Sequence, residues 1–207
     1  MVPIDTLLLF FTSSLLLALA PGPDNLFVLA QSAQHGRRAG LIVTCGLCTG
    51  ILVHTAAVSL GVAAIFQTSV MAFNLLKGIG AAYLLYLAYL SFKAGGASGV
   101  ASVDRLSVGK LYRRGVIMNV TNPKVSIFFM AFLPQFVDPL RGSIVVQMLI
   151  LGAVFIISTI LIFGGVSLLA GTFGQWMTRS ERAGKILNKT AGSIFAVLAV
   201  KLMTAHR

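Results

Sequence analysis

The feature that most constrains this chain is a series of long apolar runs with little hydrophilic sequence between them. No Asp, Glu, Lys or Arg occurs in 39–76 or in 142–178, and the longest hydrophilic stretch, 93–114, has only 22 residues. A membrane-spanning helix needs about 20 apolar residues. With 57% apolar and 10% charged residues, the chain has too few polar groups to cover a water-soluble globule. The sequence predicts an all-α integral membrane protein with a single membrane domain over 1–207.

The runs predict six transmembrane helices. The first starts near residue 6 and is interrupted, and the others cover about 39–65, 70–92, 113–137, 143–169 and 185–203. A Gly-rich tail ending at Trp176 is expected after the fifth helix. The apolar segment 7–20 is interpreted as part of the first helix and not as a secretory signal, because Asp5 precedes it without any Lys or Arg and Pro21 would follow the cleavage site.

Basic residues indicate the orientation in the membrane. The first, third and fifth loops together hold 11 of the 16 Lys and Arg residues, whereas the other side of the membrane holds three. The positive-inside rule places the richer loops in the cytoplasm and therefore both termini outside it. The net charge of +11 is thus a topology signal, and its distribution over short loops argues against a nucleic-acid partner.

The segment 120–137 contains a helix start in the middle of an apolar run. Asn122 is a good N-cap and Pro123 fits the first helical position, where its missing N–H costs nothing. Lys124 follows in the first turn, where the helix dipole disfavours a positive charge. A lysine near the bilayer centre costs roughly 2.5 to 3.5 kcal/mol, so a counter-charge, a water-filled cavity or a substrate is expected to hold it.

A second break lies near the start of the chain. Pro21, Gly22 and Pro23 cannot continue a helix, and Asp24 then falls in the first turn of a new one, where negative charge is favoured. Pro23 and Asp24 correspond to Pro123 and Lys124 at an offset of 100 residues. The chain is therefore interpreted as two repeats, about 1–93 and 113–207, with three helices each. An odd number of helices requires the second repeat to be inverted, an arrangement typical of transporters with a binding site between broken helices.

Asp24 and Lys124 carry opposite charges at equivalent positions of the two repeats. An α-amino acid carries the same two charges, so we expect its ammonium at Asp24 and its carboxylate at Lys124. The alternative is that the two side chains pair only with each other, as a structural lock or gate. Asn25, Asn119 and Asn122 lie near the breaks and either contact the substrate or cap unpaired backbone groups.

Other polar residues of the runs give weaker signals. Cys45, Cys48 and His54 raise the alternatives of a soft-metal exporter or a thiol-redox membrane protein, but the spacing aligns Cys48 and His54 poorly on a helix, and no metal site is predicted. Gln31 and Gln135 are expected to bond neighbouring helices. No set of side chains suited to catalysis is evident, so an enzyme is not expected and no cofactor is predicted. Close helix packing is expected at the small residues Gly46, Gly50, Gly78, Gly80 and Ala81.

The motifs together resemble the LysE/RhtB family of bacterial amino-acid exporters, in the segments PGPDN (21–25), GRRAG (36–40), KGIGAAYLLYL (77–87), NPK (122–124) and LPQF (133–136). The resemblance covers nearly the whole chain. It implies a bacterial inner-membrane efflux carrier with six helices, driven by the proton-motive force and assembled as a homodimer. The second helix has no acid, which favours a neutral substrate such as threonine, homoserine or leucine. Asp24 is the first candidate for carrying the proton and His54 the second.

Overall fold

A computed structural model describes residues 2–20, 22–68, 70–93, 103–179 and 181–204. All regular elements of these residues are helical. They are α1 (Ile4–Leu19), α2 (Pro23–His35), α3 (Arg37–Thr68), α4 (Val70–Lys93), α5 (Val108–Val120), α6 (Pro123–Ile127), η1 (Phe128–Phe132), η2 (Leu133–Phe136), η3 (Pro139–Arg141), α7 (Ile144–Arg179) and α8 (Glu181–Thr204). The predicted all-α class is confirmed.

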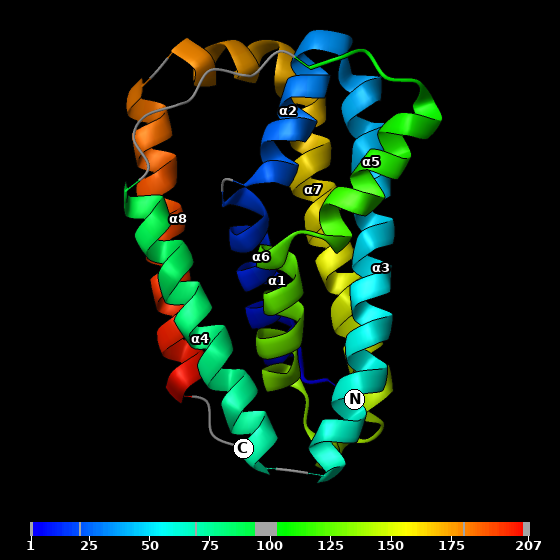
Figure 1. Ribbon diagram of the computed structural model, residues 1–207, viewed down its shortest axis with the longest axis vertical. Helices are drawn as coiled ribbons and strands as arrows, with labels where there is room; N and C mark the ends of the chain where they lie inside the picture. Colours follow the sequence, from blue (N-terminus) through cyan, green and yellow to red (C-terminus); the bar gives the residue numbers. More distant parts are fainter. Residues whose placement is uncertain (1, 21, 69, 94–102, 180, 205–207) are drawn as a thin grey trace.

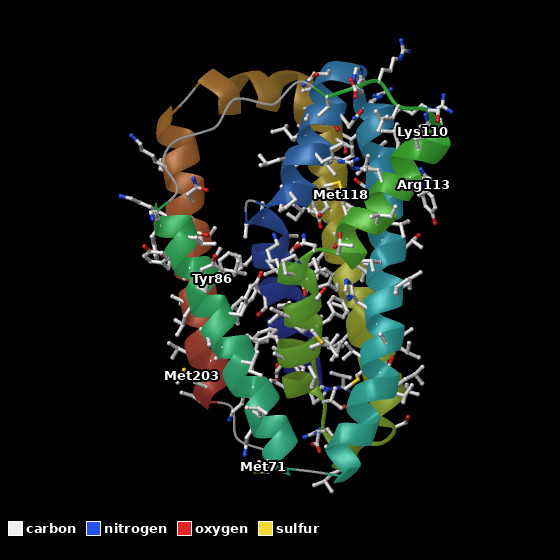
Figure 2. All side chains as sticks on the ribbon, viewed as in Figure 1. Met71, Tyr86, Lys110, Arg113, Met118 and Met203 are labelled. Atoms are coloured by element: carbon white, nitrogen blue, oxygen red, sulfur yellow. The ribbon has the colours of Figure 1, made fainter. Side chains whose placement is uncertain are left out.

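The long helices run roughly along one axis of an elongated bundle (Figure 1). α3 packs against α5 and α7, α4 packs against α8, and α7 also contacts α1 and α2. The start of α1 and the end of α8 both lie in the lower half of the view (Figure 1). Lys110 and Arg113, at the start of α5, lie at the upper end, and Met71, at the start of α4, lies at the lower end (Figure 2).

Both predicted helix breaks are present. α2 begins at Pro23 after an angle of 63° to α1, and the segment from Pro123 to Phe136 is bent by 49° from α5. Beyond the second break the helix changes pitch. The α-helical turns of α6 give way to a π-type turn in η1 and then to 3₁₀ geometry in η2, where Pro134 removes a backbone donor.

Two single helices of the described residues are long and apolar enough to cross a bilayer. They are α3 over Arg37–Gly61 and α7 over Ile144–Ala170, with mean hydropathies of 2.0 and 2.6. If each bent pair counts as one span, the number is four. The expected tail after the fifth helix is instead helical, since α7 continues to Arg179 and its last part turns across the upper end of the bundle (Figure 1). Its glycines disfavour a helix by only about 1 kcal/mol each, and the segment has no proline.

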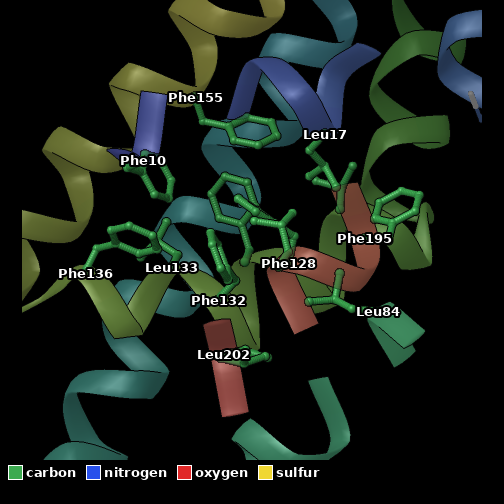
Figure 3. Close-up of a cluster of buried hydrophobic side chains, with 14 of the residues drawn as sticks. Phe10, Leu17, Leu84, Phe128, Phe132, Leu133, Phe136, Phe155, Phe195 and Leu202 are labelled. Atoms are coloured by element: carbon green, nitrogen blue, oxygen red, sulfur yellow. The ribbon is translucent and has the colours of Figure 1, made fainter. Parts of the chain in front are cut away.

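A cluster of buried apolar side chains, many of them aromatic, surrounds the second broken helix (Figure 3). The Phe10 ring of α1 lies 5.1 Å from that of Phe136, and the rings of Phe128 and Phe132 lie 4.8 Å apart. Because lipid is as apolar as these rings, the cluster stabilises the fold through close packing and not through removal of the rings from water. The cluster fixes α1, η1 and η2 against α7 and α8, and thereby positions the two breaks.

Glycines allow α3 and α5 to approach closely. A Cβ on Gly46 would lie 2.2 Å from the Tyr112 carbonyl oxygen, and one on Gly115 would lie 2.5 Å from that of Val43. A Cβ on Gly50 would lie 2.6 Å from the side chain of Asn119. The packing role predicted for Gly46 and Gly50 is confirmed, as is that of Gly80, whose Cβ would lie 2.1 Å from that of Ala131. The prediction is wrong for Gly78, where an added Cβ would meet nothing within 4 Å. Gly50 also makes room for a residue of the site described below.

Candidate functional site

The first break presents an acid at the start of a helix. Gly22 is extended and precedes α2, Pro23 takes the first helical position, and Asp24 lies in the first turn. The Asp24 side chain is only 2% exposed. Pro21, the other predicted helix breaker, lies outside the described residues. The carboxylate thus lies where the partial positive charge of α2 favours it.

The second break has the local geometry that its sequence predicts. The Asn122 side chain accepts a hydrogen bond of 3.0 Å from the Lys124 backbone N–H, and Pro123 takes the first position of α6. The Asn122 carbonyl accepts the Ser126 N–H at 3.0 Å, which begins the helix. Asn122 therefore caps α6, and its side chain is buried with the Nδ2 group unpaired within the described residues.

The Lys124 ammonium reaches across to the end of α1. Its Nζ donates to the carbonyl oxygens of Ala20 at 3.0 Å and Leu17 at 3.3 Å. These carbonyls belong to the last turn and C-cap of α1, where the helix dipole is negative. The charge that is unfavourable in the first turn of α6 is thus stabilised by another helix. Gly22 leaves room for it, since a Cβ there would lie 3.1 Å from Nζ.

Two further side chains donate to helix ends beside the breaks. Asn25 Nδ2 donates to the Ala18 carbonyl at 2.6 Å, which satisfies another end group of α1. His54 of α3 donates from Nε2 to the Asn119 carbonyl at 3.1 Å, near the end of α5. Because a carbonyl only accepts, this bond places a proton on Nε2. The His54 ring also packs on Phe129, with 5.7 Å between the ring centroids.

Asp24, Asn119 and Lys124 line one small pocket, whose cavity volume of about 10 Å³ is roughly the room that a single water molecule needs. Asn119 Nδ2 donates to Asp24 Oδ2 over a long 3.5 Å. Asp24 Oδ1 and Asn119 Oδ1 are buried and have no hydrogen-bond partner among the described residues. Within that part of the chain, Asp24 and Lys124 also form no ion pair within 4.0 Å. A direct lock between the two charges is therefore not the arrangement found, because the lysine binds backbone carbonyls instead.

The remaining predicted residues lie elsewhere. Gln31 donates to the Asp104 carbonyl at 3.2 Å, so it bonds the segment before α5 and not a neighbouring helix. Gln135 donates to the Ala131 carbonyl one turn earlier, and the prediction that it bonds a neighbouring helix is wrong. Cys45 is exposed and Cys48 is half-buried, both as free thiols, and neither lines the pocket.

The sequence interpretation missed the residues of α7 that line this pocket. Phe155, Thr159 and Phe163 of α7 line the same pocket. Their spacing of four residues places them on one face of the helix. The spacing is visible in the sequence, but an apolar membrane helix has several such faces and periodicity does not indicate which one borders a polar pocket.

These features define a class of protein: a helical membrane protein whose two broken helices meet at a small buried pocket that contains an acid, an amide and a lysine. Residues 15–206 match the LysE type translocator family, and the chain belongs to this family. It is therefore a membrane efflux protein and not an enzyme.

Similar proteins extend over almost the full length. A homoserine/homoserine lactone efflux protein of Salmonella typhimurium is 34% identical over 198 residues, which is 95% of each chain. An uncharacterized membrane protein of Vibrio cholerae is 32% identical over 199 residues, or 96% of each chain. No solved structure matches this chain.

Proposed function

We propose that this chain exports small neutral amino acids from the bacterial cytoplasm through the inner membrane. The observation that carries the proposal is that one pocket contains both a cation and buried acceptor atoms without a hydrogen-bond partner. Among the described residues, Asp24 Oδ1 and Asn119 Oδ1 are buried acceptors without a donor of ordinary geometry, and Lys124 supplies a positive charge in the same pocket. An α-amino acid has three ammonium donors and an anionic carboxylate, so it complements both. Because the pocket has room for only about one water molecule in this structure, the proposal requires the carrier to open before the substrate binds.

Energetics favour a ligand in this position. A buried polar atom without a partner costs about 1 to 3 kcal/mol, which a bound ammonium would recover at Asp24 and Asn119. The carboxylate then meets the Lys124 ammonium, since the Lys124 backbone N–H already bonds the Asn122 side chain. In this assignment Asn25 and Asn122 position the backbone around the substrate, because both already bond helix termini.

The proposed membrane topology is six spans in two inverted repeats, with both termini outside the cytoplasm. α4 and α8 complete the count as the third and sixth spans. Packing supports the relation between repeats: α3 packs on α5 as α7 packs on α1 and α2, while α3 with α7 and α4 with α8 form matching pairs. Pro23 and Pro123 both begin half-helices in corresponding positions.

Protons are the proposed coupling ion, with Asp24 as their carrier. The Asp24 carboxylate is buried in the pocket, so protonation there would compete directly with binding of an ammonium. His54 is linked to Asp24 through Asn119: its Nε2 bonds the Asn119 carbonyl, and the Asn119 side chain donates to Asp24. A homodimer is part of the proposal on the strength of the family resemblance, and cross-linking in native membranes tests it.

Efflux from preloaded cells tests the proposed function directly. Cells expressing the chain are loaded with a panel of neutral and basic amino acids, and the appearance of each outside the cell is followed with and without an uncoupler. We expect export of a small neutral amino acid that stops with the uncoupler. Asp24→Asn should abolish it, whereas Cys45→Ala with Cys48→Ala should not. Unchanged export in Asp24→Asn would contradict the proposed site.

A further inference from the structure

A small apolar cluster lies between the pocket and the end of the bundle where α5 starts (Figure 2). Phe163 belongs both to the cluster and to the pocket lining, whereas Ala39 and Leu111 lie near the starts of α3 and α5. Among the described residues this group is smaller than the cluster around the second broken helix. We call it the upper cluster, and its buried members are Val28, Ala39, Val43, Leu47, Leu111 and Phe163. The proposed topology places it on the cytoplasmic side, where a substrate for export enters.

Residues 103–107 cross this end of the bundle, from beside α2 to the start of α5, without forming a helix (Figure 1). Leu106 of this segment packs against the upper cluster. Three hydrogen bonds also join the segment to the last turns of α2. Gln34 accepts the Val103 N–H at 3.1 Å, His35 Nε2 donates to the Val103 carbonyl at 2.9 Å, and Gln31 donates to the Asp104 carbonyl at 3.2 Å. Each bond joins a side chain to loop backbone, so all three can break while α2 stays helical.

One face of α2 leads from this segment to the pocket. Asp24, Val28, Gln31 and His35 recur at intervals of four, three and four residues, which places them on the same side of the helix. At 1.5 Å per residue the face is about 16 Å long. Val28 is fully buried in the upper cluster, and the buried Gln31 has an amide oxygen without a partner among the described residues. The face is therefore polar except at Val28, which suits a route for a charged substrate that the upper cluster closes.

α2 has a glycine at each end. Gly22 is extended and precedes the helix, whereas Gly36 follows it with φ of 87°, a conformation that L side chains rarely adopt. A Cβ on Gly36 would meet no atom within 4 Å, so this glycine serves the backbone conformation and not close packing. A short helix between two such joints can tilt while its own hydrogen bonds remain intact.

We propose that residues 103–107 and this face of α2 form the cytoplasmic gate of the pocket. Release of the segment from Gln31, Gln34 and His35 lets α2 tilt away from the upper cluster and admits the substrate to Asp24. This inference rests on the proposed function and identifies where its pathway opens. The gate is closed in the structure, in agreement with a pocket that has room for about one water molecule.

The reactivity of a buried cysteine measures how often the gate opens. In the background without Cys45 and Cys48, the Val28→Cys variant is prepared in inside-out membrane vesicles and treated with a membrane-impermeant maleimide. The reaction should be slow while the gate is intact, because Val28 is 0% exposed. Gln34→Ala with His35→Ala removes two of the three hydrogen bonds. Each lost bond favours the open gate by about fivefold, so the reaction should become about five- to twentyfold faster.

Gln147→Ala is the matched control for this measurement. The Gln147 side chain also holds a loop, through hydrogen bonds to the backbone of Asp138 and to the Gly142 carbonyl at the other end of the bundle. Its loss should leave the reaction of Val28→Cys unchanged. An equal increase in Gln147→Ala would show a general loosening of the fold and would overturn the gate.

An unchanged reaction rate in Gln34→Ala with His35→Ala also overturns the gate. If Val28→Cys does not reach the membrane, Val43→Cys in the same cluster gives the same comparison, since Val43 is also 0% exposed. An unchanged rate at that position overturns the inference in the same way.

A second measurement links the gate to export. His35→Cys with Val103→Cys, joined by a short bifunctional thiol reagent, should lose amino-acid export, whereas each single-cysteine variant treated in the same way should still export. Export that survives cross-linking overturns the gate and leaves the proposed function supported. The cysteine reaction needs no transported substrate, so a faster reaction in Gln34→Ala with His35→Ala supports the gate even where wild type exports no amino acid, a result that overturns the proposed function alone.

Discussion

At the scale of single residues, Lys124 serves the fold and the proposed site with one group. Its ammonium satisfies two carbonyls at the end of α1 and also lines the pocket beside Asp24. The sequence shows that this charge needs a partner, because a lysine at this position is opposed both by the dipole of its own helix and by the cost of a charge inside the bilayer. Which group would be the partner depends on a contact 104 residues away in the chain, and no local pattern indicates it.

Lys124→Met should lower both stability and export. The substitution leaves the Leu17 and Ala20 carbonyls without their donor, at about 1 to 3 kcal/mol each if they remain buried. We expect a lower unfolding temperature of the purified protein in detergent and a loss of amino-acid export. If the Lys124→Met variant unfolds at a lower temperature but exports at the wild-type rate, the lysine serves only to hold α1.

Gly22→Ala should affect export more than stability. The added Cβ would lie 3.1 Å from the Lys124 Nζ, so the ammonium must shift by a few tenths of an ångström. The extended backbone of Gly22 tolerates alanine, and we expect a severalfold slower initial rate of export. Gly78→Ala is the control, because no atom lies within 4 Å of the Cβ that it adds. Equal export by the two variants would argue against a need for this close approach.

At the scale of elements, the sequence predicts the breaks well and their surroundings poorly. Pro23 and Pro123 begin helices as expected, because a missing N–H and a fixed φ act locally. The α7 wall of the pocket and the helical continuation to Arg179 were not predicted. The first depends on which face of an apolar helix meets the breaks. The second depends on glycines that a helix tolerates when packing supports it.

The α3–α5 contact should tolerate added side-chain volume poorly. Gly46→Ala places a Cβ 2.2 Å from the Tyr112 carbonyl oxygen, which a backbone group cannot avoid by rotating. The helices must separate, at a cost of about 1 to 3 kcal/mol, and Asn119 on α5 shifts with them. We expect a lower unfolding temperature and weaker export.

Gly61→Ala in the same helix is the matched control, because its Cβ meets nothing within 4 Å. The alanine there should be neutral or slightly stabilising, since it lowers the conformational entropy of the unfolded chain. If Gly46→Ala were as stable as Gly61→Ala, the helices would have to be farther apart than the structure places them.

At the scale of the whole molecule, the distribution of basic residues predicts the orientation. The residues near the start of α5, among them Lys110 and Arg113, lie at one end of the bundle (Figure 2), and the segment with η3 connects the helices at the other. In a background without Cys45 and Cys48, a cysteine replacing Leu140, which is 95% exposed, should react with a membrane-impermeant maleimide added to whole cells. A cysteine replacing Ser107 should react only after the membrane is opened. The reverse labelling pattern would invert the proposed topology.

The hydrogen bonds from Lys124 to the end of α1 have a mechanical consequence for a carrier. A substrate carboxylate that recruits the ammonium draws it away from the carbonyls of Leu17 and Ala20. Binding of the substrate then breaks the two hydrogen bonds that hold the junction of α1 and α2, and release of the substrate restores them. Lys124 would thereby couple occupancy of the pocket by substrate to movement of α1 relative to α2.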